Sequence, residues 1–341
     1  MFIIRMLLKI VWYILLFLIS LIIIIGIVFN WPVTDKNEEM EMGVSFVDHH
    51  ARSLELDWKE TYLAILDDLG VKKVRLGAYW NNIEISPGEF NFDDLDFQIK
   101  EAQKRDVDVI LAFGIKAPRW PECFIPEFYV ENKENREVQL LEYEKILVER
   151  YMGYDNISYW QVENEPFLPF FGDCPAEAID AQLVDREIAQ VKEINPEREI
   201  IVTDSGELSW WHEAAKRADV FGTTLYRTIY KEPFGYFTYP VGPSFFRIKA
   251  LIIKYFSDQE NVIVSELQAE PWGPGWILHM SLEEQFKSMN PEIFKETVDY
   301  AKKTKFDACY LWGAEWWYWL KTKQGDDEMW ETAREVFSEK E

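Results

Sequence analysis

The chain has 341 residues, of which 48% are hydrophobic and 16% aromatic, and its formal net charge is −24. This length and hydrophobic content allow one large folded domain and exclude a chain that is disordered throughout. The acidic balance, with no cluster of Lys and Arg, argues against a nucleic acid partner, because such binding needs a basic patch that displaces counterions.

The N-terminal segment is a candidate transmembrane helix. From Ile10 to Phe29 the chain is uncharged and almost entirely apolar, and about 20 such residues suffice to cross a bilayer. Arg5 and Lys9 precede this run, whereas four acidic residues fall between positions 35 and 41. The positive-inside rule therefore predicts a cytoplasmic N-terminus, a lipid bilayer around the helix, and an extracytoplasmic location for the rest of the chain.

A cleaved signal peptide is the alternative for this segment. Its apolar core would span about 7–15 residues and end at a small-x-small site, which residues 26–32 do not offer. We therefore expect an uncleaved membrane anchor at residues 1–30, a linker at residues 31–42 and one folded domain at residues 43–341.

Beyond the linker, short apolar runs alternate with amphipathic stretches, which is the pattern of βα units. Apolar spacing near 3.6 predicts helices at Trp58–Leu69 and Val138–Tyr151, and a last helix is expected from Asp326 to about Phe337. Eight strands are expected, at Gly43–Phe46, Val74–Gly77, Val109–Phe113, Ser158–Val162, Ile200–Thr203, Val220–Leu225, Val262–Glu266 and Ala308–Trp312. The fold class predicted is α/β, a (β/α)₈ TIM barrel preceded by an N-terminal transmembrane helix, since eight such units take about 250 residues.

Carboxyl groups stand at the ends of the fourth and seventh expected strands. Asn164-Glu165 follows one strand and Glu266 ends the other, about 100 residues later, which is about three βα units. Strand ends meet at one mouth of such a barrel. Two carboxyl groups there are the minimal apparatus for hydrolysing a glycosidic bond, with one protonating the leaving oxygen while the other attacks or activates water.

Three cysteines are present. Cys309 lies in an apolar run and is expected to be a small buried residue. Cys123 and Cys174 follow the third and fourth expected strands, so they fall on neighbouring loops in a compartment that permits oxidation. A disulfide between them stays open at this stage, because Cα atoms more than about 7 Å apart cannot be bridged.

Three stretches together resemble clan A of the glycoside hydrolases: Val74-Arg75-Leu76 through Trp80, Ile85 through Phe92, and the Asn164-Glu165-Pro166 motif. This clan comprises retaining (β/α)₈ enzymes such as cellulases, mannanases and β-galactosidases, for example families 5, 39 and 42. The resemblance spans roughly Gly43 to Trp317. It implies that Glu165 is the general acid/base, that Glu266 is the nucleophile and that Asn164 binds the sugar 2-hydroxyl.

The same resemblance implies roles around the nucleophile. Arg75 on the second strand matches the arginine that holds the nucleophile ionised, and Tyr226 matches the tyrosine that donates a hydrogen bond to it. Trp312 matches the tryptophan beneath the reacting sugar. From their expected top-face loops, Trp80 and Trp272 are candidates for stacking on sugar rings.

Two positions depart from the cellulase-like pattern. Thr224-Leu225-Tyr226 stands where that pattern has His-x-Tyr, and Phe113 through Lys116 stands where it has a strand-three histidine. Both departures leave the two acids intact and the subsite contacts open.

Other acids and histidines compete for roles at the mouth. Glu163 is expected behind the site, and Glu270, four residues past the seventh strand, would contact a hydroxyl or be solvated. His49 and His50 follow Asp48 and invite a metal site, but the chain has only four histidines. We expect a sugar-hydroxyl contact or a structural hydrogen bond there, and no metal or cofactor.

The sequence thus predicts a membrane-anchored retaining β-glycosidase acting on an extracytoplasmic poly- or oligosaccharide. A catalytically silent carbohydrate-binding protein on the same fold is one alternative, which the intact acid pair disfavours. A transglycosylase is another, since it passes the same covalent intermediate to a sugar acceptor. The sugar, its linkage and the oligomeric state stay open.

Overall fold

The computed structural model describes residues 2–131, 133–169, 172–175 and 177–338. Its centre is a closed barrel of parallel strands in the order β1-β12-β11-β8-β7-β6-β5-β2. These strands are β1 (Glu41–Phe46), β2 (Lys73–Gly77), β5 (Asp108–Phe113), β6 (Ile157–Val162), β7 (Glu199–Asp204), β8 (Val220–Leu225), β11 (Val262–Gln268) and β12 (Ala308–Trp312). All eight predicted strands are confirmed.

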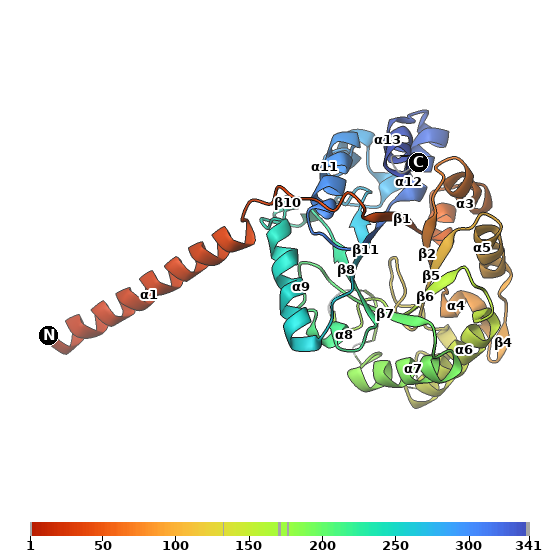
Figure 1. Ribbon diagram of the computed structural model, residues 1–341, viewed down its shortest axis with the longest axis horizontal. Coiled ribbons are helices and arrows are strands. Elements are labelled where there is room, and N and C mark those ends of the chain that lie inside the picture. Colours follow the sequence, from red (N-terminus) through yellow and green to blue (C-terminus); the bar gives the residue numbers. More distant parts are fainter. Residues whose placement is uncertain (1, 132, 170–171, 176, 339–341) are drawn as a thin grey trace.

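Helices surround the barrel (Figure 1). The longer ones are α3 (Trp58–Asp67), α5 (Asp93–Gln103), α6 (Lys133–Tyr151), α7 (Ala181–Ile194), α9 (Pro243–Ser257), α11 (Pro291–Lys302) and α13 (Glu328–Ser338). Short elements lie in the connections: α2 (Asp48–Ser53), α4 (Trp80–Ile83), β3 (Glu84–Ser86), β4 (Glu89–Phe90), η1 (Glu127–Tyr129), α8 (His212–Ala215), β9 (Thr228–Lys231), β10 (Gly235–Thr238), η2 (Ile277–His279), α10 (Leu282–Gln285), α12 (Ala314–Trp319) and η3 (Leu320–Gln324). The TIM barrel is therefore confirmed.

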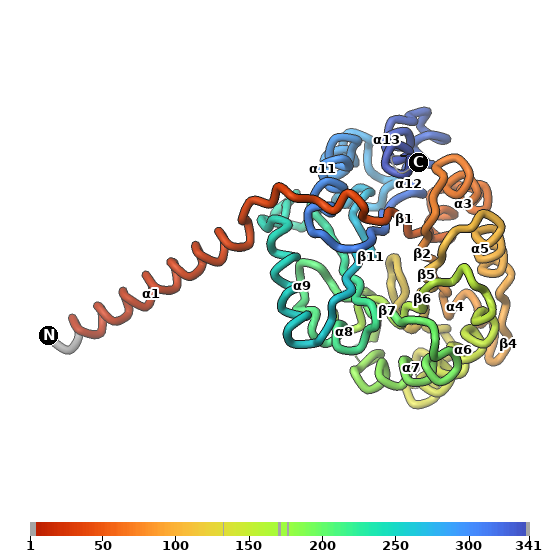
Figure 2. The backbone as a smooth tube through the Cα atoms, viewed as in Figure 1, coloured from red at the N-terminus to blue at the C-terminus, as the bar shows by residue number. Residues whose placement is uncertain are grey.

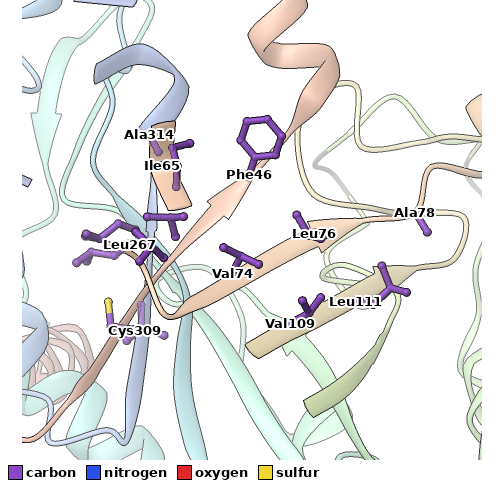
Figure 3. Close-up of a cluster of buried hydrophobic side chains, with 14 of the residues drawn as sticks. Phe46, Ile65, Val74, Leu76, Ala78, Val109, Leu111, Leu267, Cys309 and Ala314 are labelled. Carbon is purple, nitrogen blue, oxygen red and sulfur yellow. The ribbon is translucent and has the colours of Figure 1, made fainter. Parts of the chain in front are cut away.

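Successive side chains along a strand alternate between the surrounding helices and the barrel interior. On β2, Val74 and Leu76 belong to the main core between barrel and helices (Figure 3), whereas Arg75 between them contacts side chains of other strands inside the barrel. A smaller cluster, which includes Ile110, Ile201 and Tyr310, is separate from that main core. Successive strand residues point to opposite faces, so this smaller cluster fills the barrel interior below Arg75.

Local sequence signals define several helix starts. Asp57 caps α3 by accepting hydrogen bonds from the backbone N–H groups of Lys59 and Glu60 at 2.9 and 3.1 Å. Asp180 and Asn290 cap α7 and α11 in the same way. Each such cap contributes about 1 kcal/mol, because it satisfies backbone donors that have no partner within the helix.

The N-terminal helix α1 (Phe2–Phe29) extends away from the barrel. Its residues Arg5–Phe29 are long and apolar enough to cross a membrane. Figure 2 follows the chain from the end of α1 past the first turns of α9 to β1. Asn37 fixes this passage, since its N–H and its side-chain amide donate to the carbonyls of Lys302 and Phe306, both at 2.9 Å.

The predicted linker at residues 31–42 overlaps β1, which begins at Glu41 because its N–H donates to the carbonyl of Asp307 at 2.9 Å and the strand pairs with β12 from Ala308. The division into anchor, linker and folded domain stays a prediction. Residue 1 of the predicted anchor and residues 339–341 of the predicted domain lie outside the described residues.

Candidate active site

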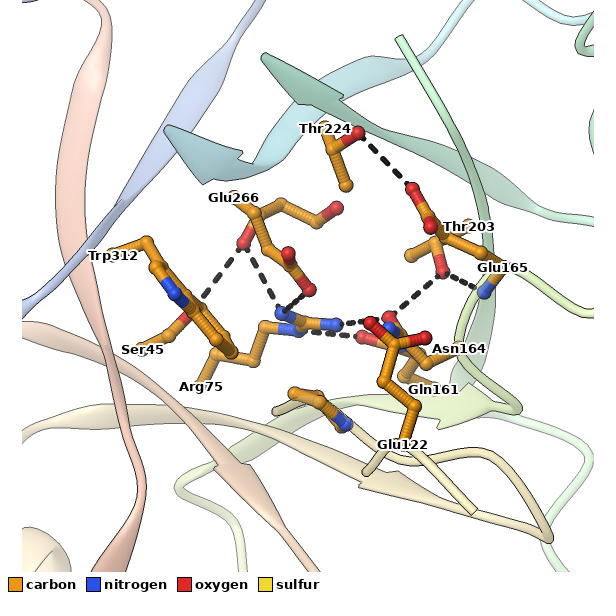
Figure 4. Close-up of polar contacts among 12 residues, drawn as sticks. Ser45, Arg75, Glu122, Gln161, Asn164, Glu165, Thr203, Thr224, Glu266 and Trp312 are labelled. Atoms are coloured by element: carbon orange, nitrogen blue, oxygen red, sulfur yellow. Dashed lines mark hydrogen bonds and ion pairs between the residues drawn. The ribbon is translucent and has the colours of Figure 1, made fainter. Parts of the chain in front are cut away.

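Glu165 and Glu266 both lie at the carboxyl end of the barrel, and Arg75 contacts Glu266 and the Asn164 beside Glu165 (Figure 4). Glu165 follows β6, and Glu266 is part of β11 where the strand register shifts between Val264 and Glu266. Such an irregularity re-aims a side chain at the end of a strand. The structure therefore brings together the two predicted acids, with each only 5% exposed.

Glu266 has a cation on one oxygen and a hydroxyl on the other. Arg75 Nη1 lies 2.8 Å from its Oε1, and the Tyr226 hydroxyl donates to its Oε2 at 2.9 Å. Burial raises the pKa of Tyr226 well above its usual value, and the Glu266 charge adds to this. The Tyr226 hydroxyl therefore stays protonated and remains a donor.

Arg75 is the hub of the site. Besides its ion pair with Glu266, it donates to Gln161 Oε1 and to Asn164 Oδ1, both at 2.7 Å. The guanidinium is buried, and a buried cation needs several acceptors in fixed positions to offset its lost hydration. One arginine thus orients Glu266 and the amide beside Glu165.

Glu165 is held differently. Its backbone has a positive φ of 47°, a conformation that costs a non-glycine residue energy and tends to occur at functional sites. Its N–H donates to the Thr203 hydroxyl at 2.9 Å, and its Oε1 accepts a hydrogen bond from the Thr224 hydroxyl at 3.0 Å. Burial, followed by the charges of Glu122 and Glu266, raises the pKa of Glu165 well above its usual value.

A third carboxyl group, Glu122, lies in the site, although no strand end or motif predicts it there. It lies in the loop after β5 and has an ion pair with Lys116 at 3.5 Å. Burial raises the pKa of Glu122 to about 7, with the Glu266 charge contributing and Lys116 opposing. The next residue, Cys123, forms a disulfide with Cys174 across a Cα–Cα distance of 5.1 Å, so the disulfide fixes this loop to the one that follows β6.

Two residues that differ from the cellulase-like pattern take part in this arrangement. Thr224 stands where the pattern has a histidine and donates to Glu165, as described above. Lys116 follows β5, where the other histidine is missing, and its Nζ donates to the carbonyl of Glu165 at 3.0 Å. Both departures therefore contact Glu165, one through a hydroxyl group and the other through a lysine side chain.

Glu270 is buried and paired, which excludes the expectation that it is simply solvated. Arg119 contacts both of its oxygens, with Nη2 at 2.9 Å from Oε2, and Trp312 Nε1 donates to Oε1 at 3.0 Å. Burial would raise the pKa of Glu270, but Arg119 and His50 outweigh it and lower the value to about 2. The Arg119 guanidinium lies 4.4 Å from the centre of the Trp312 ring, so this pair supports that tryptophan.

Two cavities meet at the acid pair. One, of about 380 Å³, is lined by Glu266, Trp312, Trp272, Trp276 and the Arg119–Glu270 pair, among others. The second, of about 360 Å³, is lined by Glu165, Ser205, Glu207, Tyr230 and Tyr239, among others. Glu122, Tyr226, Glu266 and Trp272 line both, so the cleft continues past the two acids on either side.

Only some of the tryptophans predicted to contact the substrate lie in the cleft. Trp272 and Trp312 line the cleft, whereas Trp80 is fully buried, and its ring stacks on Tyr129 and Tyr143. Trp80 Nε1 donates to Glu84 at 2.6 Å. The prediction of a substrate contact at Trp80 is therefore wrong, because α4 turns this ring into the core under the loop.

The remaining candidates stand behind the site. Glu163 accepts hydrogen bonds from the backbone N–H groups of Ile115 and Lys116 at 2.8 and 2.6 Å, which fits the expectation that it lies behind the acids. His50 is buried with Nε2 at 3.4 Å from Glu270, and burial lowers the pKa of His49 to about 3 and that of His50 to about 4. Within the described residues, no group of three or more His, Cys, Asp and Glu side chains could hold a metal ion.

A family comparison identifies the class of protein. The model of the cellulase family, glycosyl hydrolase family 5, matches residues 37–228, a range that contains Arg75, Asn164, Glu165 and Tyr226 but ends before Glu266. A search of curated protein sequences finds no match.

Solved structures share the fold at low sequence identity. A β-galactosidase from the Antarctic haloarchaeon Halorubrum lacusprofundi aligns with a TM-score of 0.59 and 15% identity over 87% of this chain and 57% of its own. An exo-β-1,4-mannosidase from Opitutaceae bacterium strain TAV5 gives 0.56 and 13% over 80% of this chain and 51% of its own. A GH5_18 protein from Bifidobacterium longum, in complex with Manβ1-4GlcNAc, gives 0.58 and 12% over 88% of this chain and 78% of its own. The chain spans just over half the length of the first two.

Proposed function

Since the chain belongs to the cellulase family, glycosyl hydrolase family 5, we propose that it is a retaining β-glycosidase that hydrolyses O-glycosidic bonds by double displacement. Glu266 is the nucleophile and Glu165 the general acid/base. The observation that carries this proposal is the contact network of Arg75, which joins Glu266 to Asn164 beside Glu165.

The surroundings of Glu266 suit a nucleophile. Its oxygens face the Arg75 guanidinium and the Tyr226 hydroxyl, two donors that hold the side chain in one orientation. In the first step a Glu266 oxygen attacks the anomeric carbon, and the bond from that carbon to the leaving oxygen breaks. The product is a glycosyl ester on Glu266.

The surroundings of Glu165 suit an acid. Because burial and two neighbouring carboxyl groups raise its pKa, Glu165 carries a proton that it gives to the leaving oxygen as the glycosidic bond breaks. Once Glu266 is esterified its charge is gone, so the pKa of Glu165 falls. Glu165 then takes a proton from the water that attacks the anomeric carbon and releases Glu266, which restores both groups.

The two cavities bind the parts of the substrate on either side of the scissile bond. The cavity with Trp312, Trp272 and the Arg119–Glu270 pair lies on the side of Glu266, so it holds the sugar that is transferred to the nucleophile. The cavity with Tyr230 and Tyr239 lies on the side of Glu165 and holds the leaving group. The β-galactosidase, β-mannosidase and Manβ1-4GlcNAc named for the similar structures support a β-linked substrate.

The apolar helix α1 supports a membrane location. We assign residues 1–30 as an uncleaved anchor and residues 31–42 as a linker, with the N-terminus in the cytoplasm. The catalytic domain, residues 43–341, is then extracytoplasmic and acts on a poly- or oligosaccharide there. The disulfide between Cys123 and Cys174 supports this side of the membrane, since such bonds persist in oxidising compartments.

Proton NMR of the first-formed product tests the mechanism. With a panel of aryl β-glycosides, the proposal predicts that the β-anomer of the released sugar forms first and that the α-anomer follows only by mutarotation. Initial release of the α-anomer would overturn double displacement. Added acceptor sugars that divert most of the product into new glycosides would make transfer, not hydrolysis, the main activity, and absence of turnover with every glycoside would favour a binding protein.

A further inference from the structure

Helix α9 has an apolar face that no part of the described chain covers. Leu251, Ile252, Tyr255 and Phe256 are 65%, 41%, 83% and 68% exposed. Their spacing places them on one side of the helix. Four large exposed apolar side chains on one helix form a contiguous patch, and such patches mark contact surfaces.

This face begins where the candidate membrane helix meets the barrel. The Phe29 ring at the end of α1 lies 5.0 Å from the Phe245 ring of α9, edge to face. Ile248, one helical turn before Leu251 and Ile252, lines a cavity together with Val28 and Trp31. The apolar face of α9 therefore continues directly from the end of α1.

Polar contacts fix the two helices to each other at this junction. The N–H of Gly242 donates to the carbonyl of Phe29 at 3.2 Å, and the Ser244 hydroxyl donates to the carbonyl of Trp31 at 2.6 Å. Arg247 forms an ion pair with Asp35 at 3.2 Å. Because α1 joins the barrel through these contacts, a bilayer around α1 has its surface at the level of α9.

The direction of α9 is also suitable. Figure 1 shows α9 crosswise to α1 at the edge of the barrel from which α1 departs. A helix that crosses the bilayer leaves a crosswise neighbour lying along the membrane surface, over a length of about 22 Å for 15 residues. Trp31, which is 65% exposed directly after α1, is a residue type enriched at this depth.

The charges of α9 fit the same surface. Its three ionisable residues, Arg247, Lys249 and Lys254, are all of basic type, although the chain as a whole carries −24. Lys249 faces inward and donates to the carbonyl of Gly206 at 2.6 Å, whereas Lys254 is outside and pairs with Glu260 at 3.0 Å. A lysine beside an apolar face can keep its ammonium group at the headgroups while its stem lies on the lipid.

We propose that α9 is an interfacial helix whose Leu251, Ile252, Tyr255 and Phe256 insert into the bilayer surface beside the anchor. The inference rests on the anchor assigned to α1 and adds a second contact, so that the barrel lies with its α9 side on the membrane. Helices of this kind bury their apolar side about 5–10 Å into the boundary between headgroups and acyl chains.

The test uses the full-length protein in phosphatidylcholine vesicles with and without phosphatidylglycerol. An environment-sensitive fluorophore is attached at Tyr255→Cys or, as the control, at Val138→Cys, which is also exposed, at 62%, but lies on α6. Native cysteines do not compete, because Cys123 and Cys174 are bonded and Cys309 is buried.

The iodide quenching constant at position 255 should be about threefold or more below that at position 138, because the headgroup region excludes the aqueous quencher. Spin-labelled lipid should quench position 255 and leave position 138 unchanged. Adding Ile252→Glu should restore iodide access at position 255, whereas Ile85→Glu, at an exposed apolar site on β3, should not.

Equal iodide access at both positions in vesicles that float after an alkaline wash would overturn the interfacial helix while the anchor stands. Failure to float would overturn both. Protection from iodide without quenching by spin-labelled lipid would also overturn the proposal and would assign the face to a contact between copies of the chain. Glycosidase activity, measured in the same samples, reports separately on the proposed function.

Discussion

Glu165 and Glu266 stand at the same end of the barrel and are equally buried, yet their surroundings differ. Glu266 faces a guanidinium and a hydroxyl donor, whereas Glu165 faces Glu122 and Glu266, with a threonine hydroxyl as its side-chain donor. Burial alone would not distinguish the two acids, because the two residues are equally buried. The identity of the neighbours therefore separates an acid from a nucleophile, which is the general way in which one site holds two carboxyl groups in opposite roles.

Removing the nucleophile should have the largest effect. Glu266→Gln keeps the shape of the side chain but cannot form the glycosyl ester, so kcat should fall by about 10⁴-fold or more. Steady-state hydrolysis of an aryl β-glycoside measures this loss. Glu260→Gln, at an exposed residue before β11, is the matched control and should retain activity. Activity above a tenth of the native rate in Glu266→Gln would remove Glu266 from the reaction.

Removing the acid should reduce the rate by an amount that depends on the leaving group. Glu165→Ala should reduce turnover of a disaccharide by about 10³-fold, because general acid catalysis contributes that order of rate. For a dinitrophenyl glycoside, whose leaving group needs no proton, the first step should change little. Pre-steady-state release of dinitrophenol distinguishes these cases. An equal loss with both leaving groups would contradict the acid role.

Removing the disulfide should loosen the side of the site that contains Glu122. Cys174→Ser opens a loop closed across 51 residues, which should lower the free energy of unfolding by about 2–4 kcal/mol. Denaturant unfolding under oxidising conditions gives this value, and Cys309→Ser, at the buried free thiol, serves as the comparison. An unchanged unfolding free energy in Cys174→Ser would mean that the bridge contributes nothing to stability.

Neutralising Glu122 should have the smallest effect on the rate, and it tests whether a neighbouring charge sets the pKa of Glu165. Its charge raises the pKa of Glu165, so Glu122→Gln should lower that pKa, and the basic limb of the kcat/KM profile should move to lower pH by about one unit or less. The acidic limb and the maximum rate should change little. A basic limb that moves to higher pH would contradict the assigned electrostatic role of Glu122.

The strands were predictable because buried parallel strands leave continuous apolar runs, and all eight occur where the sequence placed them. The same runs locate Glu165 and Glu266 at strand ends. Trp80 was misjudged because sequence position gives the loop but not the rotation of α4 that turns the ring into the core.

Glu122 and the Arg119–Glu270 pair could not be predicted for a related reason. Both depend on where the loop after β5 lies against other loops, and neither strand periodicity nor motif spacing contains that information. The disulfide was open for the same reason, since its two cysteines belong to loops whose separation only the folded chain defines.

The most direct test of the central claim is mass spectrometry of the intact protein after incubation with a panel of 2-deoxy-2-fluoro β-glycosides, followed by peptide mapping. Such donors form the glycosyl ester and release it slowly. One adduct is expected, located on Glu266, and it should be absent in Glu266→Gln. An adduct on Glu165 or Glu270 would contradict the assigned nucleophile.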